Sequence, residues 1–279
     1  METQETGKRG MPNGANWSAL LKSAISEPGT LSKCYSVFHQ YSLGNQLLAM
    51  FQCSARGIPL GPIATFPRWK ALGRSVQKGQ KAIVLCMPCT FKSKQEPGES
   101  GEQAEAGQVR TGFIYRPNWF ALGQTAGAEY VPPPIPDWNK AQALATLDIL
   151  QEPFAMADGN CQGYAIARKV HVSPIAENPD KTLFHEIAHV VLGHTSEGQC
   201  SDSERTPKDA REMEAETVAL LCVESLGLPG AAEARGYIQH WYSGPDIPEK
   251  SAKRILKAAD SILKAGYPKP EPLNATDLS

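Results

Sequence analysis

Residues 183–194 read LFHEIAHVVLGH, and this stretch decides the fold expected for the second half of the chain. Asn178, Pro179 and Asp180 signal the start of a helix before it, and Gly193 signals the end of that helix. Apolar residues cover the predicted helix on nearly every side, so we expect it to be buried. Buried histidine and glutamate side chains need polar partners, which gives the polar positions of this helix a chemical meaning.

The segment HEIAH places two histidines four residues apart on the predicted helix. His185 and His189 then project from one face, and both imidazoles can bind one zinc ion at roughly 2.0–2.1 Å. Glu186 lies beside the ion, where it can act as a general base on zinc-bound water and then protonate a leaving amine. The alternative is a solvated surface helix, which the apolar flanks disfavour. The motif predicts a hydrolase centre with one Zn²⁺ per chain.

A catalytic zinc ion needs a third protein ligand. His194 follows His189 by five residues, whereas the pattern HExxHxxGxxH places its third histidine at six, so we set His194 aside. The next predicted helix contains REMEAE, in which Glu212 and Glu216 share a face and Glu214 points elsewhere. We assign Glu212 to the metal and Glu216 to the free N–H of a ligating histidine. An exchange of these two roles stays open.

Several further polar residues receive no role from their spacing. Cys86 and Cys89 lie in an apolar strand pattern with no second CxxC, so we expect strand cysteines rather than a metal or redox site. The seven cysteines follow no disulfide framework, and we expect reduced thiols. Four residues could stabilise an oxyanion, and nothing selects one of them: Tyr164, Tyr237, His240 and Tyr242.

Composition favours a soluble globular protein. Of 279 residues, 41% are hydrophobic and 20% are charged, which excludes a disordered or membrane-embedded chain. The segment Met1–Asn16 lacks the apolar core of a signal peptide, and no later stretch approaches the roughly 18 apolar residues of a membrane span. We expect a cytoplasmic protein without a membrane partner.

The run VPPPIP at 131–136 favours stiff extended backbone and predicts a linker between two domains. The expected fold class is α+β, with a small α+β N-terminal domain and a mostly helical, zincin-like C-terminal domain. The strongest elements are predicted helices at 17–26, 44–56 and 139–151 and strand-like segments at 81–91, 112–120 and 164–172. The predicted boundaries are 1–15 disordered, 16–130 first domain with a mobile insert at 95–110, 131–138 linker, 139–266 second domain and 267–279 disordered tail.

Three N-terminal segments resemble the N-terminal domain of ArdC-type antirestriction proteins: YSLGNQLLAMFQ, FPRWKALGRSVQKGQKAI and NWFALGQT. That family pairs a single-stranded-DNA-binding domain with a zincin-like metallopeptidase domain. LFHEIAHVVLGH and REMEAETVALLCVESLGL resemble its peptidase part and, more distantly, ImmA/IrrE-type peptidases. In those peptidases ExxA(N/D/E) supplies the third ligand, which the resemblance places at Glu212.

Charge agrees with the nucleic-acid binding that the resemblance implies. Between Asn16 and Gln95 there are ten cations and a single anion, Glu27, so this segment should attract polyanions. Cations, aromatics and amides together build grooves that follow a backbone and stack bases, although Trp69 and Tyr41 could equally belong to the core. The candidate DNA contacts are Tyr41, Asn45, Gln52, Arg68, Trp69, Lys70, Arg74, Lys78 and Lys81.

These observations favour an antirestriction-type protein that combines single-stranded DNA binding with a zinc-dependent peptidase acting on an unknown protein substrate. The alternative is a non-catalytic protein that shields single-stranded DNA and keeps the zinc site as a structural clip. A third hypothesis has the peptidase act on a transcriptional repressor, with DNA binding incidental. Glu186 favours catalysis, because a structural zinc site needs no general base.

Overall fold

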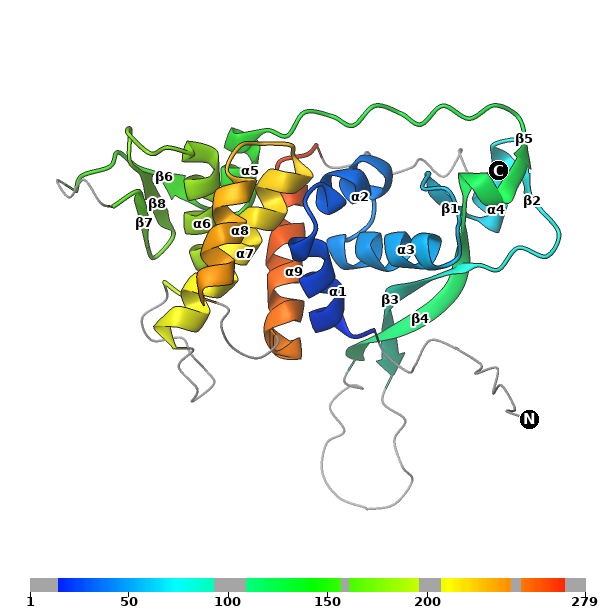
Figure 1. Cartoon of the computed structure of the whole chain (residues 1–279), viewed down its shortest axis with the longest axis horizontal. Coiled ribbons are helices and arrows are strands. Elements are labelled where there is room, and N and C mark those ends of the chain that lie inside the picture. The colour runs from blue at the N-terminus through cyan, green and yellow to red at the C-terminus, as the bar shows by residue number, and fades with distance from the viewer. Residues whose placement is uncertain (1–14, 93–108, 157–160, 196–206, 242–246, 269–279) are drawn as a thin grey trace, which may run out of the picture. The chain divides into compact units, whose positions relative to one another are not determined.

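The computed structural model describes residues 15–92, 109–156, 161–195, 207–241 and 247–268 (Figure 1). Helices and strands are both abundant, which confirms the predicted α+β class. The chain forms two compact units. The helical unit comprises Asn16–Leu47 and Pro133–Ser279, and the strand-rich unit comprises Met1–Ala15 and Leu48–Pro132.

The helical unit is discontinuous in sequence, which differs from the predicted domain at 16–130. Helices α1 (Trp17–Ser26) and α2 (Thr30–Phe38) belong to it, and α3 (Leu43–Ala55) is divided between the units after Leu47. The physical reason is the apolar face of each of the first two helices. Leu21 and Leu31 are fully buried because α1 packs on α9 and α2 packs on α7.

Helix α7 (Lys208–Ser225) is the centre of the helical unit. Every residue from Met213 to Ser225 is buried, as expected for a helix covered on all sides. It packs against α2 and three other helices, which contribute further apolar faces to the same core. Those helices are α6 (Pro179–Val191), α8 (Ala231–Trp241) and α9 (Glu249–Ala265).

A small sheet completes the helical unit, with the strand order β6-β8-β7. Its strands are β6 (Leu150–Gln151), β7 (Gly163–Ile166) and β8 (Lys169–Val172), and α6 packs on the last two. Two predictions differ here: α5 (Lys140–Thr146) ends before 151, and the single segment at 164–172 is a hairpin. Positive φ at Asp148 (53°) and Ala167 (52°) turns the chain at both places, and neither residue is a glycine that would announce a turn.

The strand-rich unit is built on the long antiparallel pair β3 (Ile83–Lys92) and β4 (Val109–Ala121), formed where the sequence predicts strands. Strand β1 (Ile63–Thr65) pairs with the other edge of β4. A second pair joins β2 (Arg74–Val76) to β5 (Thr125–Gly127). Helix α4 (Phe66–Ala71) and the short helix η1 (Leu122–Gln124) connect these strands.

Two tryptophans belong to the core of the strand-rich unit. Trp69 and Trp119 are buried together with Ile63, Ile83 and Leu85. The Trp69 indole N–H donates a hydrogen bond to the Phe120 carbonyl oxygen at 2.8 Å, which satisfies its polar atom inside the core.

Three sequence predictions fall wholly or largely outside the described residues: the disordered ends at 1–15 and 267–279 and the insert at 95–110. The six cysteines within the described residues are all free thiols, and Cys200 lies outside them. Within the same part of the chain, no helix combines the length and the apolar character that a membrane span requires.

Candidate metal centre

Helix α6 presents the two motif histidines. It begins with Pro179 in its first turn and with Asp180 next to it, an arrangement that suits the free N–H groups and positive dipole of a helix start. It ends at Val191, and Gly193, two residues later, has a φ of 76° that only glycine adopts without strain. Between these ends, His185 and His189 lie one turn apart with their Nε2 atoms separated by 3.1 Å.

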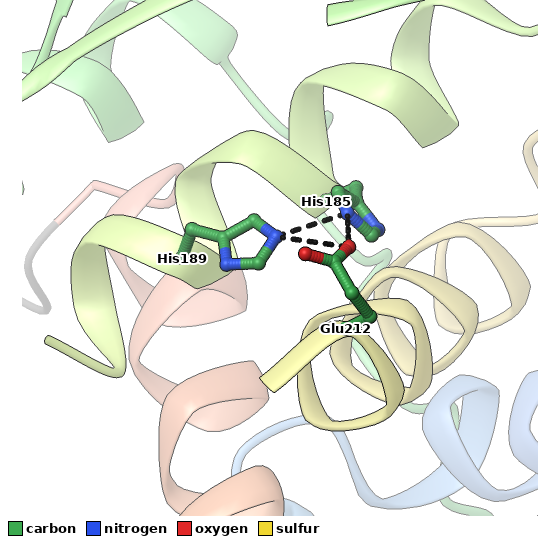
Figure 2. Close-up of side chains that lie close together, drawn as sticks. All are labelled: His185, His189 and Glu212. Carbon is green, nitrogen blue, oxygen red and sulfur yellow. Dashed lines mark hydrogen bonds and ion pairs between the residues drawn. The ribbon is translucent and has the colours of Figure 1, made fainter. Parts of the chain in front are cut away.

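Glu212 on α7 completes a triangle with these histidines, and Figure 2 shows the three side chains converging. Its Oε2 lies 3.3 Å from His185 Nε2 and 3.6 Å from His189 Nε2. Ligands held at roughly 2.0–2.1 Å around a tetrahedral ion are about 3.3 Å apart, so the three atoms fit around one ion. Among the described residues, this is the one group of three or more His, Cys, Asp or Glu side chains with such spacing.

Glu216 lies one turn further along α7, behind His185. Its Oε2 is 2.8 Å from His185 Nδ1, and Lys181 Nζ is 2.8 Å from its other oxygen. Burial opposes ionisation of this carboxyl, but the hydrogen bond with His185 and the charge of Lys181 lower the pKa of Glu216. The structure therefore places Glu212 toward the centre and Glu216 on the far nitrogen of the histidine.

Neighbouring carboxylates change the pKa of His185. Burial lowers the pKa of this imidazole, yet its hydrogen bonds with Glu212 and Glu216 outweigh burial and raise the pKa of His185 to about 9. The hydrogen bonds from His185 and His189 hold the pKa of Glu212 well below its usual range.

Glu186 is buried beside the triangle. Burial raises the pKa of this carboxyl, against the opposing charges of His185 and His189. Strand β7 passes close to this carboxylate at Gly163, where an added Cβ would lie 2.7 Å from Thr182 Cγ2. A Cβ on Gly163 would lie 3.0 Å from Glu186 Oε1 and 2.9 Å from the His171 carbonyl oxygen.

Among the described residues, the three side chains of the triangle are partly exposed. The Glu212 side chain is 27% exposed, and the two histidines also reach the surface in part. A closed structural zinc site is usually filled by four protein ligands, whereas a catalytic site keeps one position for water or substrate. The arrangement can therefore hold an ion by three protein atoms and admit a small molecule beside it.

Two residues that were not predicted from the sequence lie next to the centre. His194, which was set aside as a ligand, has its Nδ1 3.1 Å from His189 Nδ1. Glu214, which was expected to point elsewhere, is fully buried and has its Oε2 3.2 Å from His194 Nε2. The glycine–histidine pair that directly follows the helix is the sequence signal that could have identified this contact.

Two of the four residues without an assigned role contact neighbouring side chains, and the side chains of the other two are not described. The Tyr164 ring stacks on His171 with centroids 4.2 Å apart, and Lys181 Nζ lies 5.9 Å from the centroid of the Tyr237 ring. Tyr242 and the side chain of His240 are outside the described part of the structure. Cys86 and Cys89 both lie on β3.

Several candidate DNA contacts are used inside the fold. Trp69 is 1% exposed and belongs to the core. Gln52 is buried and binds strand β3 with both ends of its amide, donating to the Val84 carbonyl oxygen at 2.8 Å and accepting from Val84 N–H at 2.9 Å. Arg74 donates to Thr125 Oγ1 at 2.8 Å and to the Ala128 carbonyl oxygen.

The other candidates divide by unit and by exposure. Asn45 is buried and Tyr41 half-buried, and both belong to the helical unit. Phe66, which the sequence analysis did not select, is 52% exposed at the start of α4. Four cations of the strand-rich unit are exposed: Arg68, Lys70, Lys78 and Lys81.

The N-terminal part of the chain is similar to a known protein family. Residues 14–116 match a family described as the N-terminal domain of anti-restriction factor ArdC. No curated protein is significantly similar in sequence. The metal-free crystal structure of the antirestriction ArdC protein from plasmid R388 is 19% identical, with a TM-score of 0.48 over 90% of this chain and 94% of that one. Its Mn(II)-bound structure is 17% identical, with a TM-score of 0.46 over 92% and 100%. Residues 14–116 of the chain therefore belong to the family of ArdC N-terminal domains.

Proposed function

We propose that the chain is a metal-dependent peptidase that also binds single-stranded DNA. The observation that carries the peptidase part is the convergence of His185, His189 and Glu212 beside the buried Glu186. Two imidazoles and one carboxylate suit Zn²⁺ among the common divalent ions. The ion would supply a Lewis acid that polarises water and the scissile carbonyl group.

The protein side chains have separate tasks in this proposal. Glu186 would accept a proton from the attacking water and deliver it to the leaving amine, and its raised pKa suits a group that must both take and release a proton. Glu216 holds the His185 ring by the nitrogen that faces away from the centre. Gly163 keeps strand β7 clear of the Glu186 carboxylate.

The partial exposure of the centre supports catalysis over a structural clip. Three protein atoms converge among the described residues, and 27% of the Glu212 side chain is exposed, so solvent can reach this ligand. A clip would have no use for a buried carboxylate beside the ion, since burial of an unpaired charge costs free energy. Glu186 is therefore better explained as a general base.

The DNA-binding part rests on charge and exposure in the strand-rich unit. From Leu48 to Gln95 the sequence contains eight cations and no carboxylate. Lys70 and Lys78 are exposed, and among the described residues no carboxylate pairs with either. Phe66 offers an exposed ring at the start of the helix that carries Lys70, so a base-stacking surface lies next to a phosphate-binding charge.

The experiment compares purified wild-type protein with Glu186→Gln, which keeps the size and polarity of the side chain but removes the base. Bound metal is measured after loading with Zn²⁺ or Mn²⁺. Hydrolysis of casein is followed with and without single-stranded DNA. Both proteins should bind one ion per chain, and hydrolysis should fall by at least roughly 100-fold in the variant.

Each part of the proposal can fail separately. Wild-type protein that binds neither ion after reconstitution would refute the metal centre. Equal hydrolysis by wild-type and Glu186→Gln would refute the general base. A wild-type protein that binds one ion, binds single-stranded DNA and hydrolyses no substrate would favour the protective, non-catalytic function instead.

A further inference from the structure

The turn that ends α6 brings a third histidine against a motif histidine. The Gly193 N–H donates to the Val190 carbonyl oxygen at 3.1 Å, and the His194 N–H donates to the His189 carbonyl oxygen at 2.8 Å. With the positive φ of Gly193, these two bonds form a Schellman motif. In this motif the residue after the glycine is tied to the residue five positions earlier, so the backbone itself places His194 next to His189.

The side chains continue this contact into the protein. His194 Nδ1 lies 3.1 Å from His189 Nδ1, and His194 Nε2 lies 3.2 Å from Glu214 Oε2. The same carboxylate oxygen is 3.5 Å from Arg254 Nη1, and Arg254 Nη2 donates to the Leu192 carbonyl oxygen at 3.0 Å. The His194 and Glu214 side chains are almost completely buried. A hydrogen-bonded chain thus runs from a motif histidine to an ion pair.

If His189 binds an ion, as the function proposed above requires, the donors and acceptors of these hydrogen bonds can be assigned in only one way. His189 Nε2 faces the centre, so the proton of the neutral ring is on Nδ1. That N–H needs an acceptor, so His194 Nδ1 is unprotonated and its own proton is on Nε2. This second N–H points at the Glu214 carboxylate. Each contact then joins one donor to one acceptor.

The other motif histidine, His185, contacts a carboxylate without a second histidine between them. His185 Nδ1 meets the Glu216 carboxylate directly at 2.8 Å. We propose that His194 and Glu214 together position His189 for the ion, in the way that Glu216 alone positions His185. Both carboxylates come from α7, which also supplies Glu212. His194 and Glu214 are therefore positioning residues, and neither touches the substrate.

The test measures the Zn²⁺ dissociation constant of the full chain by competition with a fluorescent chelator. His194→Phe keeps a ring and removes both nitrogens, and we expect about 10- to 100-fold weaker binding. Glu216→Gln, which removes the carboxylate that contacts His185, should weaken Zn²⁺ binding by a similar factor. His194→Asn, whose amide oxygen can accept the His189 N–H, should recover part of the affinity. His39→Phe, a half-buried histidine of the same unit, should leave it unchanged within about twofold.

A second measurement separates positioning from packing. Long-range ¹H–¹⁵N spectra of the Zn²⁺-loaded wild-type protein should show His189 protonated at Nδ1 and His194 protonated at Nε2. A proton on His194 Nδ1 would overturn the proposal. Melting temperatures of the metal-free variants show whether each one folds. If His194→Phe does not fold, Glu214→Gln, which keeps the side-chain volume and removes the charge, should still weaken Zn²⁺ binding several-fold.

The outcomes distinguish this inference from the proposed function. Equal Zn²⁺ affinity of the wild-type protein and a folded His194→Phe variant overturns the role of His194 and leaves the metal centre intact. A wild-type protein that binds no Zn²⁺ overturns both. Weaker binding in His194→Phe, with partial recovery in His194→Asn and no change in His39→Phe, supports the inference.

Discussion

The metal centre differs from the cationic stretch of the strand-rich unit, the cation-rich sequence from Leu48 to Gln95, in what its polar residues contact. In the centre, charged groups from two helices meet one another, as Lys181, Glu216 and His185 do. In the cationic stretch, some charged residues form hydrogen bonds within the unit, as Arg74 does, and others are exposed to solvent, as Lys70 is. A reaction centre needs a fixed geometry, which constrains the spacing of residues in the sequence. A binding surface needs exposure, and residue type alone does not reveal exposure.

The largest expected effect tests the division of roles at the centre. Glu212→Ala removes an atom of the triangle, and we expect the loss of stoichiometric Zn²⁺, a decrease in affinity of at least roughly 100-fold. Glu216→Gln should weaken binding by only about 10- to 100-fold. Metal analysis after dialysis against a chelator series measures both. If Glu216→Gln causes the larger loss of Zn²⁺ affinity, Glu216 is the ligand and Glu212 is the supporting residue.

The next effect tests whether the aromatic residues of the strand-rich unit serve the core or DNA. Trp69→Ala should reduce the free energy of unfolding by about 3–5 kcal/mol, because it empties a buried site. Phe66→Ala should change stability little and weaken single-stranded DNA binding by roughly 1–3 kcal/mol. Chemical denaturation and fluorescence anisotropy measure the two quantities. An unstable Phe66→Ala protein with normal DNA binding would contradict the assignment of the exposed ring.

A pH series sharpens the account of the centre. The pKa of His185 is raised to about 9 in the metal-free centre, and an ion binds only the unprotonated nitrogen. Zn²⁺ affinity should therefore decrease as the pH falls below 9, by about tenfold per unit for this single proton. Calorimetry in buffers of different ionisation enthalpy should detect proton release. A constant affinity between pH 7 and 9 would show that His185 is already neutral.

The smallest expected effect concerns phosphate contacts. A triple alanine variant of Lys70, Lys78 and Lys81 should reduce the slope of log affinity against log salt by about 2, because each lost contact with single-stranded DNA contributes roughly 0.7. The matched control replaces three exposed lysines of the helical unit: Lys208, Lys250 and Lys257. If the control variant changes the slope equally, the contacts are unspecific charge effects rather than a surface of the strand-rich unit.

The two regions also differ in how much the sequence predicts. The i, i+4 spacing of His185 and His189 on an apolar helix predicts their shared face, and the structure brings Glu212 to them. The structure also places Glu216 on the far nitrogen of His185. The sequence predicts the positions of these residues because metal ligation requires particular atoms at particular distances. Their chemical roles stay predictions until metal binding is measured.

Other features depend on tertiary contacts that the sequence does not display. Trp69 and Gln52 look like DNA-binding residues by type, but packing against neighbouring strands uses both. The contact of His194 with His189 depends on a helix-ending turn, which a comparison with known ligand spacings does not include. Apolar periodicity predicts α1 but not its partner, so the assignment of Asn16–Leu47 to the helical unit came only from the structure.

The discontinuity of the helical unit has a consequence during synthesis. Trp17 N–H and Ser18 N–H both donate to the Glu249 carboxylate, and 232 residues separate Trp17 from this partner. The ribosome therefore releases α1 and α2 long before α7 and α9 exist to cover their apolar faces. Such distant contacts form slowly and leave early segments exposed to aggregation or chaperones. A fragment that starts at the proline-rich stretch would lack these helices and would expose the faces of α7 and α9 that they cover.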